Sequence, residues 1–354
     1  MTYRMAFATT GVPGPPVPGL RTTLFEDMFV RRYDESLLTP DPRLTGLRRI
    51  PSWFRLAHEI RRHHDEYDVV VTWTEGATVA LMTLDGMSRS LKPHVAMMYW
   101  FSRPLVRLPM QAFGNRLGAI VTWSSVQRAY AIDQLGVRPE KIYMVKHYVE
   151  QLFWSPRDVE TDMICSAGAE MRDYGTLIEA LRGTDLRCHI ATDHVRTSRI
   201  GFGRRVSAET FSQNASGGVT VGRKGLHELR DLYARSRFVV VPLRPSDTDN
   251  GVTVILEAMA MGKPVICSRT RGQVDVIQEG VTGIFVPVGD PSALRAAMLE
   301  LWNDPERART MGLAARAYVE KHHTLDKFCR DVKTAIEASL EGRPAGPDGW
   351  LAPP

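Results

Sequence analysis

The sequence has few cysteines and no arrangement of them that binds a metal or forms a redox pair. Its four cysteines are scattered along 354 residues with no C-x-x-C pair, at Cys165, Cys188, Cys267 and Cys329. This usage is typical of a reduced compartment and argues against a zinc site. The histidines add no ligand pattern, because H-E-x-x-H is absent. We therefore expect neither a metal nor a cofactor.

Long hydrophobic runs are also absent. No apolar stretch reaches the ~18 residues of a membrane-spanning helix, and the first residues lack a secretory signal pattern. We therefore expect a cytoplasmic protein. The composition, 44% hydrophobic and 24% charged, is typical of about two globular domains. The net charge of +5 is spread along the chain, which favours a solvated basic surface over nucleic-acid binding.

Short β-rich runs alternate with amphipathic stretches along the chain. Ten strands are expected, at Tyr3–Thr9, Tyr67–Thr72, His94–Trp100, Ala119–Trp123, Ile142–Val145, Met163–Ser166, Arg187–Ala191, Phe238–Pro242, Val265–Ser268 and Gly283–Val286. Strands separated by helices predict parallel sheets, and ten strands exceed one typical sheet. The expected α/β architecture therefore has two doubly wound, Rossmann-like domains, residues 1–155 and 156–323. A helix over 324–340 and a flexible tail over 341–354 would follow.

One apolar stretch, DNGVTVILEAMAMGKPVI (249–266), carries an unexpected charge. Glu257 is the only charged residue between Val252 and Met261. We expect a helix between these two residues, with Gly262 in the left-handed position that follows a helix. A carboxylate in such an apolar helix needs a hydrogen-bond donor, from the fold or from a ligand.

Two interpretations of the acids in this stretch stay open. Glu257 is either a ligand-binding carboxylate or a structural one held by a backbone group or an arginine. Asp249 is either functional or the N-cap of the helix. The helix N-terminus, Gly251–Thr253, offers N–H groups to an anion.

Residues 242–290, PLRPSDTDNGVTVILEAMAMGKPVICSRTRGQVDVIQEGVTGIFVPVGD, resemble the donor-binding region of the family-4 (group 1) retaining glycosyltransferases of the GT-B fold. The matching positions are Pro242, Glu257–Ala260, Gly262, Pro264–Ile266, Gly272, Gly280, Gly283, Pro287 and Asp290. Residues 123–156 and 166–181 resemble further segments of that family in the same order. The resemblance implies two Rossmann-like domains facing a central cleft, with the helix over 324–340 crossing back to the first domain.

The resemblance also implies a metal-independent, retaining hexosyltransferase that moves a sugar from a nucleotide-sugar donor of unknown base. The acceptor would be a small molecule, a glycan or a lipid-linked group. By position, Glu257 matches the acid that holds the ribose hydroxyls, and Asp249 the acid that meets the transferred sugar. Arg172 matches a cation that stabilises the leaving diphosphate. The further donor contacts implied are Gly11, Val221, Gly251, Val252 and Thr253.

The sequence departs from that family in three places. Ala169 stands where related sequences often have a second phosphate-binding cation, and Asp249 is one methylene shorter than the usual Glu. The strand ending at Tyr99–Ser102 lacks the usual histidine, which leaves Glu75 and Ser102 as acceptor-side candidates, although Glu75 is also interpretable as a solvated loop residue. The alternatives are a non-catalytic pseudo-glycosyltransferase that binds a partner, and a relative that performs non-glycosidic coupling or epimerisation.

Two basic and aromatic stretches, residues 48–64 and 100–113, have two interpretations. They either rest on the inner face of an anionic membrane, as a lipid-linked acceptor would require, or pack their apolar faces on the first sheet. Their place in the order of strands and helices favours packing.

Overall fold

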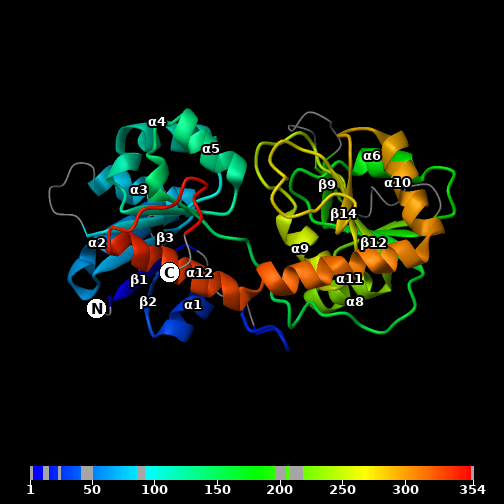
Figure 1. The fold of residues 1–354 in the computed structure, drawn as a ribbon, viewed down its shortest axis with the longest axis horizontal. Helices are drawn as coiled ribbons and strands as arrows, with labels where there is room; N and C mark the ends of the chain where they lie inside the picture. The colour runs from blue at the N-terminus through cyan, green and yellow to red at the C-terminus, as the bar shows by residue number, and fades with distance from the viewer. Residues whose placement is uncertain are drawn as a thin grey trace. The chain divides into compact units, whose positions relative to one another are not determined.

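The computed structural model describes residues 3–10, 16–22, 25–40, 51–85, 92–196, 205–207 and 218–351. The chain forms two compact units, each built on a parallel sheet (Figure 1). Unit 1 comprises Met1–Lys146 together with Phe328–Pro354, and unit 2 comprises His147–Lys327. The first boundary thus falls nine residues before the expected 155/156 division, and most of the last helix lies in unit 1.

Unit 1 contains a six-stranded sheet in the order β2-β1-β3-β4-β5-β6, with every pairing parallel. Its strands are β1 Met5–Thr9, β2 Ser36–Leu38, β3 Val69–Trp73, β4 His94–Met97, β5 Ala119–Thr122 and β6 Ile142–Met144. Its helices are α1 Phe25–Tyr33, α2 Ser52–Arg62, α3 Glu75–Asp85, α4 Pro104–Phe113, α5 Ser125–Asp133 and, from Phe328 onward, α12 Leu325–Leu340.

Unit 2 contains a second six-stranded parallel sheet, in the order β11-β8-β7-β12-β13-β14. Its strands are β7 Met163–Ala167, β8 Cys188–Ala191, β11 Val219–Val221, β12 Ser236–Val241, β13 Val265–Ser268 and β14 Gly283–Val286. A separate antiparallel pair joins β9 His194–Arg196 and β10 Arg205–Ser207. Its helices are α6 Tyr174–Leu181, α8 Leu226–Arg235, α9 Val252–Ala260, α10 Pro291–Asn303 and α11 Pro305–His322.

Burial on both faces explains why the strands are continuous apolar runs. Every residue of β1 is buried, and so are Phe238–Val241 in β12. Parallel sheets covered by helices on both faces require such runs, whereas half-exposed strands alternate apolar and polar residues. All ten expected strands are present, and the α/β prediction with two parallel sheets is confirmed.

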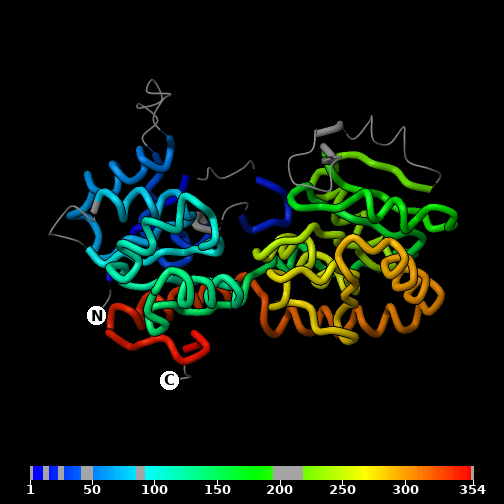
Figure 2. The backbone as a smooth tube through the Cα atoms, turned by 90° about the horizontal axis from the view of Figure 1, so that it is seen from above, coloured from blue at the N-terminus to red at the C-terminus, as the bar shows by residue number. Residues whose placement is uncertain are grey.

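Residues 341–351, expected to form part of a flexible tail, make backbone hydrogen bonds to the rest of unit 1. Beyond α12 this segment lies along the edge strand β6 (Figure 2). The N–H of Ala345 donates to the Glu140 carbonyl at 2.9 Å, and the N–H of Met144 donates to the Gly349 carbonyl at 2.8 Å. The segment therefore satisfies the Met144 N–H of β6, which an uncovered sheet edge would leave open, and the Glu140 carbonyl just before that strand.

Candidate functional site

The candidate site lies at the carboxyl end of the unit 2 sheet, where the loops after β7, β12 and β13 meet. The N–H of Arg244 donates to the Met171 carbonyl at 2.8 Å, which joins the first two loops. The N–H of Gly272 donates to the Ser246 carbonyl at 3.0 Å, which joins the last two. Ligands of parallel α/β sheets bind at this end of the strands.

Helix α9 begins and ends where the sequence predicts. Gly251 is its N-cap with φ 91°, and Gly262 follows its C-terminus with φ 71°, both in the left-handed region that favours glycine. A Cβ on Gly251 would lie 2.9 Å from Val241 Cγ1. Glycine is therefore required at position 251 for space as well as for backbone conformation.

The first turn of α9 leaves backbone donors open. The N–H of Val252 donates to the Asp249 carbonyl at 3.1 Å, and that of Ile255 to the Gly251 carbonyl at 3.0 Å. Between them, the N–H groups of Thr253 and Val254 have no acceptor among the residues that the structure describes, and Thr253 is exposed. The positive end of the helix is thus available to an anion.

Asp249 is not the N-cap, so that interpretation is wrong. The side chain is buried, and its backbone carbonyl accepts both the Val252 N–H and, at 3.1 Å, the Gln273 Nε2 amide. Gln273 is itself buried and also donates to the Asn250 carbonyl at 3.1 Å. It fixes the loop that carries Asp249. Sequence reasoning missed Gln273, because a single amide beyond the next strand has no local pattern.

Glu257 is 9% exposed and has a structural donor, the Tyr233 hydroxyl, at 3.0 Å from Oε2. Burial raises the pKa of the Glu257 carboxyl to about 8, although the Tyr233 hydroxyl and the Arg172 charge act in the opposite direction. The predicted need for a donor is met within the fold. Oε1 has no hydrogen bond within the described part of the chain, so this oxygen remains for a ligand.

Arg172 is 6% exposed and is therefore not a surface residue. Its Nε donates to the Ala167 carbonyl at 2.9 Å and its Nη1 to the Glu170 carbonyl at 2.8 Å. A Cβ built on Gly168 would lie 2.8 Å from Nη2, and one on Gly251 3.4 Å from Nη1. The guanidinium is therefore held between two glycines, beside the N-terminus of α9.

Three arginines follow β12 and β13 and could replace the cation missing at Ala169. The structure distinguishes them by burial. Arg244 is buried, and its Nε donates to the Arg172 backbone carbonyl at 3.1 Å. Arg269 and Arg271 are exposed, and Arg269 pairs with Glu279. Of these three arginines, Arg244 is the one that lies next to Arg172.

Of two further expected donor contacts, Val221 and Gly11, the structure describes only Val221. Val221 ends the edge strand β11, opposite Ile190 of β8, and is half-buried at the carboxyl end of the same sheet. Gly11 lies outside the described residues.

In unit 1, Glu75 is buried, so its interpretation as a solvated loop residue is wrong. It is the first residue of α3, and its Oε1 accepts the N–H groups of Tyr99 at 3.2 Å and Trp100 at 3.1 Å. Burial raises the pKa of the Glu75 carboxyl. The N–H of Ser102 donates to Gln127 Oε1 at 3.1 Å. Glu75, at the start of α3, thus holds the loop after β4 that carries Ser102.

Aromatic rings gather at the same end of the unit 1 sheet. Trp123 stacks on Trp73, with ring centroids 5.8 Å apart, and on Tyr99, at 5.3 Å. Phe328 of α12 meets the two tryptophan rings edge-on, at 6.2 and 6.3 Å. The first turns of α12 are therefore part of the unit 1 core.

His94 begins β4, as the sequence predicts, and lies at the opposite end from the loop that carries Ser102. It is buried, and its Nε2 lies 2.8 Å from Thr72 Oγ1. Burial lowers the pKa of His94 to about 3. It therefore does not replace the histidine that the loop lacks.

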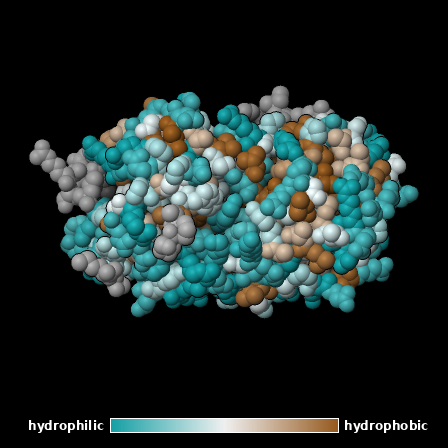
Figure 3. All heavy atoms as spheres, in the orientation of Figure 1, coloured by the Kyte–Doolittle hydropathy of each residue, from teal (hydrophilic) through white to brown (hydrophobic). Residues whose placement is uncertain are grey.

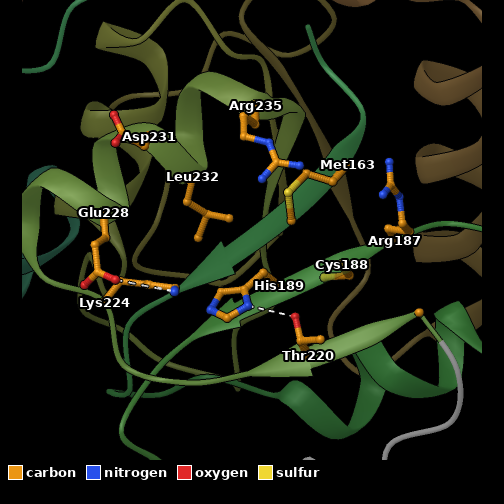
Figure 4. A pocket seen from close by; sticks show the side chains of 11 residues that line it. Met163, Arg187, Cys188, His189, Thr220, Lys224, Glu228, Asp231, Leu232 and Arg235 are labelled. Atoms are coloured by element: carbon orange, nitrogen blue, oxygen red, sulfur yellow. Dashed lines mark hydrogen bonds and ion pairs between the residues drawn. The ribbon is translucent and has the colours of Figure 1, made fainter. Parts of the chain in front are cut away.

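A cavity of 530 Å³ lies elsewhere in unit 2, between α8 and strands β7, β8 and β11 (Figure 4). Its polar groups are already paired: His189 Nδ1 lies 2.8 Å from Thr220 Oγ1, and Lys224 Nζ lies 3.6 Å from Glu228 Oε1. None of the three expected catalytic residues lines it. We therefore place the functional site at the sheet end and not in this cavity.

Across the described residues, no cluster of three or more His, Cys, Asp or Glu side chains has the arrangement of a metal site. Within that same part of the chain, every helix is too short or too polar to span a bilayer.

Comparison with known proteins agrees with this fold. Residues 174–304 match the family described as Glycosyl transferases group 1. The chain is 25% identical over 334 residues to the GDP-mannose-dependent alpha-(1-6)-phosphatidylinositol monomannoside mannosyltransferase of Mycolicibacterium smegmatis, covering 84% of this chain and 80% of that protein. It is 22% identical over 225 residues to an uncharacterized glycosyltransferase of Methanocaldococcus jannaschii, covering 57% of this chain and 61% of that protein. The solved structure of Anabaena HepE in complex with UDP-glucose has a TM-score of 0.70 at 15% identity, covering 95% of this chain and 100% of that one.

Two six-stranded parallel sheets with interleaved helices, together with this structural similarity, define the GT-B fold. Residues 174–304 therefore resemble a group 1 glycosyl transferase domain, which agrees with the resemblance carried by residues 242–290.

Proposed function

We propose that this protein is a retaining, metal-independent glycosyltransferase that moves a sugar from a nucleotide-sugar donor to an acceptor. The observation that carries the proposal is the grouping of Arg172, the open N-terminus of α9 and Glu257 at one end of the unit 2 sheet. Glu257 lies four residues beyond Thr253 on the same helix face, about 6 Å further along the axis. This spacing suits a diphosphate at the helix N-terminus and a ribose beside Glu257.

The groups have distinct roles in the proposed reaction. Negative charge grows on the diphosphate as the bond to the sugar breaks, and Arg172 with the N–H groups of α9 stabilises that charge. Glu257 Oε1 accepts hydrogen bonds from the ribose hydroxyls, which fixes the donor. Asp249, one turn before Thr253 and held by Gln273, meets hydroxyls of the transferred sugar. Retention follows if the leaving diphosphate takes the acceptor proton on the same face, which requires no side-chain base.

The relatives named above suggest the classes of donor and acceptor without fixing either. The Mycolicibacterium smegmatis relative is named for GDP-mannose and a phosphatidylinositol monomannoside, and Anabaena HepE was solved with UDP-glucose. We therefore infer a hexose donor, with UDP and GDP as the first nucleotides to test, and a glycan or lipid-linked acceptor.

Thermal unfolding with UDP, GDP, ADP, TDP and CDP tests the donor assignment. A nucleotide at about 100 times its Kd adds ~2.7 kcal/mol to the free energy of unfolding, a midpoint shift of several degrees. One nucleotide should raise the midpoint of the natural protein and not that of Glu257→Ala. Glu306→Ala, which removes an exposed ion pair with Arg309, is the control and should respond like the natural protein. No shift with any nucleotide would contradict the proposal.

Retention has its own test. Slow donor hydrolysis, followed by NMR of the released sugar before mutarotation, should give the same anomer as the donor. The opposite anomer would refute retention while leaving transferase activity in place.

A further inference from the structure

Helix α4 presents two leucines to solvent in a way that packing does not explain. Leu105 is 72% exposed and Leu108 75% exposed. They lie three residues apart, so they project from one face of the helix. In the space-filling view, hydrophobic atoms are exposed in the region that α4 occupies in Figure 1 (Figure 3).

The packing interpretation of residues 100–113 is confirmed for the buried side of α4. Val106 and Met110 are buried, and both belong to the core formed with Ile120 of β5. These residues hold α4 on the unit 1 sheet. Leu105 and Leu108 do not belong to that core, and they lie together on the exposed side of α4.

The charge around these leucines has one sign. Residues 100–118 contain three arginines and neither Asp nor Glu. Arg103 and Arg107 are exposed next to the leucines. The Arg103 guanidinium lies 5.6 Å from the ring centroid of Trp100, a half-buried residue. Exposed leucines between arginines, with a tryptophan nearby, have the chemistry of a helix that lies in the interface of an anionic membrane.

We propose that this Leu–Arg surface of α4, defined by Arg103, Leu105, Arg107 and Leu108, binds an anionic lipid bilayer. The arginines meet lipid phosphates, and the two leucines enter the boundary between headgroups and acyl chains. The inference rests on the proposed function and deepens it, because it places the acceptor in or at a membrane.

Vesicle sedimentation of the full chain tests this proposal. The probes are vesicles of phosphatidylcholine alone and of phosphatidylcholine mixed with phosphatidylglycerol. We expect binding to the mixed vesicles that weakens as salt is added, because salt screens the arginines. Leu105→Gln with Leu108→Gln should lower the partition coefficient at least tenfold, and Arg103→Gln with Arg107→Gln about fivefold per arginine.

Leu313→Gln is the matched control, because Leu313 is 57% exposed on α11, in unit 2. It should bind vesicles like the natural protein. Equal binding by the double leucine variant, or no binding to anionic vesicles, would overturn the proposal. A dimer of the natural protein that the leucine variant abolishes would also overturn it, because the surface would then join two copies of the chain.

Failure of this inference is distinguishable from failure of the proposed function. Vesicle binding is measured without any donor, and nucleotide stabilisation is measured without lipid. The leucine variant should keep the full nucleotide-induced shift of the unfolding midpoint. If nucleotides stabilise the protein and vesicles do not bind it, only the membrane proposal falls.

Discussion

Glu257 is held where its surroundings oppose ionisation, and this gives the candidate site a pH dependence. The carboxyl has a pKa of about 8 in the folded chain, above its ordinary value of 4.5. The folded state therefore binds a proton that the unfolded state has already lost between these pH values. The protonated Glu257 carboxyl therefore contributes to the free energy of unfolding. This contribution is fully present below pH 4.5 and is lost as the pH rises to 8.

Ligand affinity should change in the opposite sense, which gives a prediction for Glu257. Ribose hydroxyls donate to a carboxylate, so donor binding below pH 8 must release the proton. The affinity for a nucleotide sugar should rise as the pH approaches 8, by at most about tenfold per unit, and then level off. Calorimetric titration measures this slope. Glu257→Gln, which cannot ionise, should remove it, and an unchanged slope in that variant would assign the titration to another group.

Gly251 gives a second prediction at the residue scale, with Gly280 as its control. Both have positive φ, 91° and 73°, but a Cβ on Gly280 would meet nothing within 4 Å. Gly280→Ala should therefore cost only the left-handed backbone penalty, about 1–2 kcal/mol of unfolding free energy. Gly251→Ala should cost more, because its Cβ meets Val241, and it should also lose nucleotide stabilisation. Equal losses in denaturant unfolding would contradict this account.

At the scale of elements, the segment after α12 supports an edge strand. Truncation after Leu340 would remove the hydrogen bonds that join Ala345 and Gly349 to unit 1. We expect a lower unfolding midpoint and concentration-dependent association in size-exclusion chromatography, because β6 would become an open edge. Glu306→Ala, which removes an exposed ion pair in unit 2, is the control and should change neither. A monomeric truncated chain with unchanged stability would show that the segment is dispensable.

The sequence predicts elements well where burial gives a clear pattern. All ten expected strands are apolar runs, and α9 was expected despite β-branched residues because Gly251 and Gly262 bound it. The short strands β2, β9, β10 and β11 were missed, and β2 and β11 lack the complete burial of the equally short β6. Helix α3 was missed because EGATVALMTLD is apolar on most sides and has no helical period.

Only those site residues that belong to local sequence motifs could be predicted from the sequence. Glu257 and Arg172 were expected by position, and the structure brings the two residues to one sheet end. Gln273 and Tyr233 were not assigned, because each reaches the site through the tertiary fold. The burial of Glu75 could not be predicted from the sequence either, because it depends on the position of the loop that follows β4.

At the scale of the whole molecule, the candidate donor groups described here lie within unit 2. Hydrogen exchange with the stabilising nucleotide should therefore slow first in the loops 168–173 and 242–254. The effect should be absent in Glu257→Ala, and Glu306→Ala should behave like the natural protein. Protection confined to unit 1 would contradict the assignment of the donor site.

The division of unit 1 into two chain segments sets an order for folding during synthesis. Its core needs Phe328 against Trp73 and Trp123, yet these tryptophans leave the ribosome long before Phe328 does. The intervening unit 2, residues 147–327, is 181 residues long (327 − 147 + 1). At roughly 5–20 residues per second its translation takes about 9–36 s. During that time the aromatic cluster of unit 1 lacks Phe328 and stays exposed. Unit 1 is therefore the part of the nascent chain that we expect chaperones to bind.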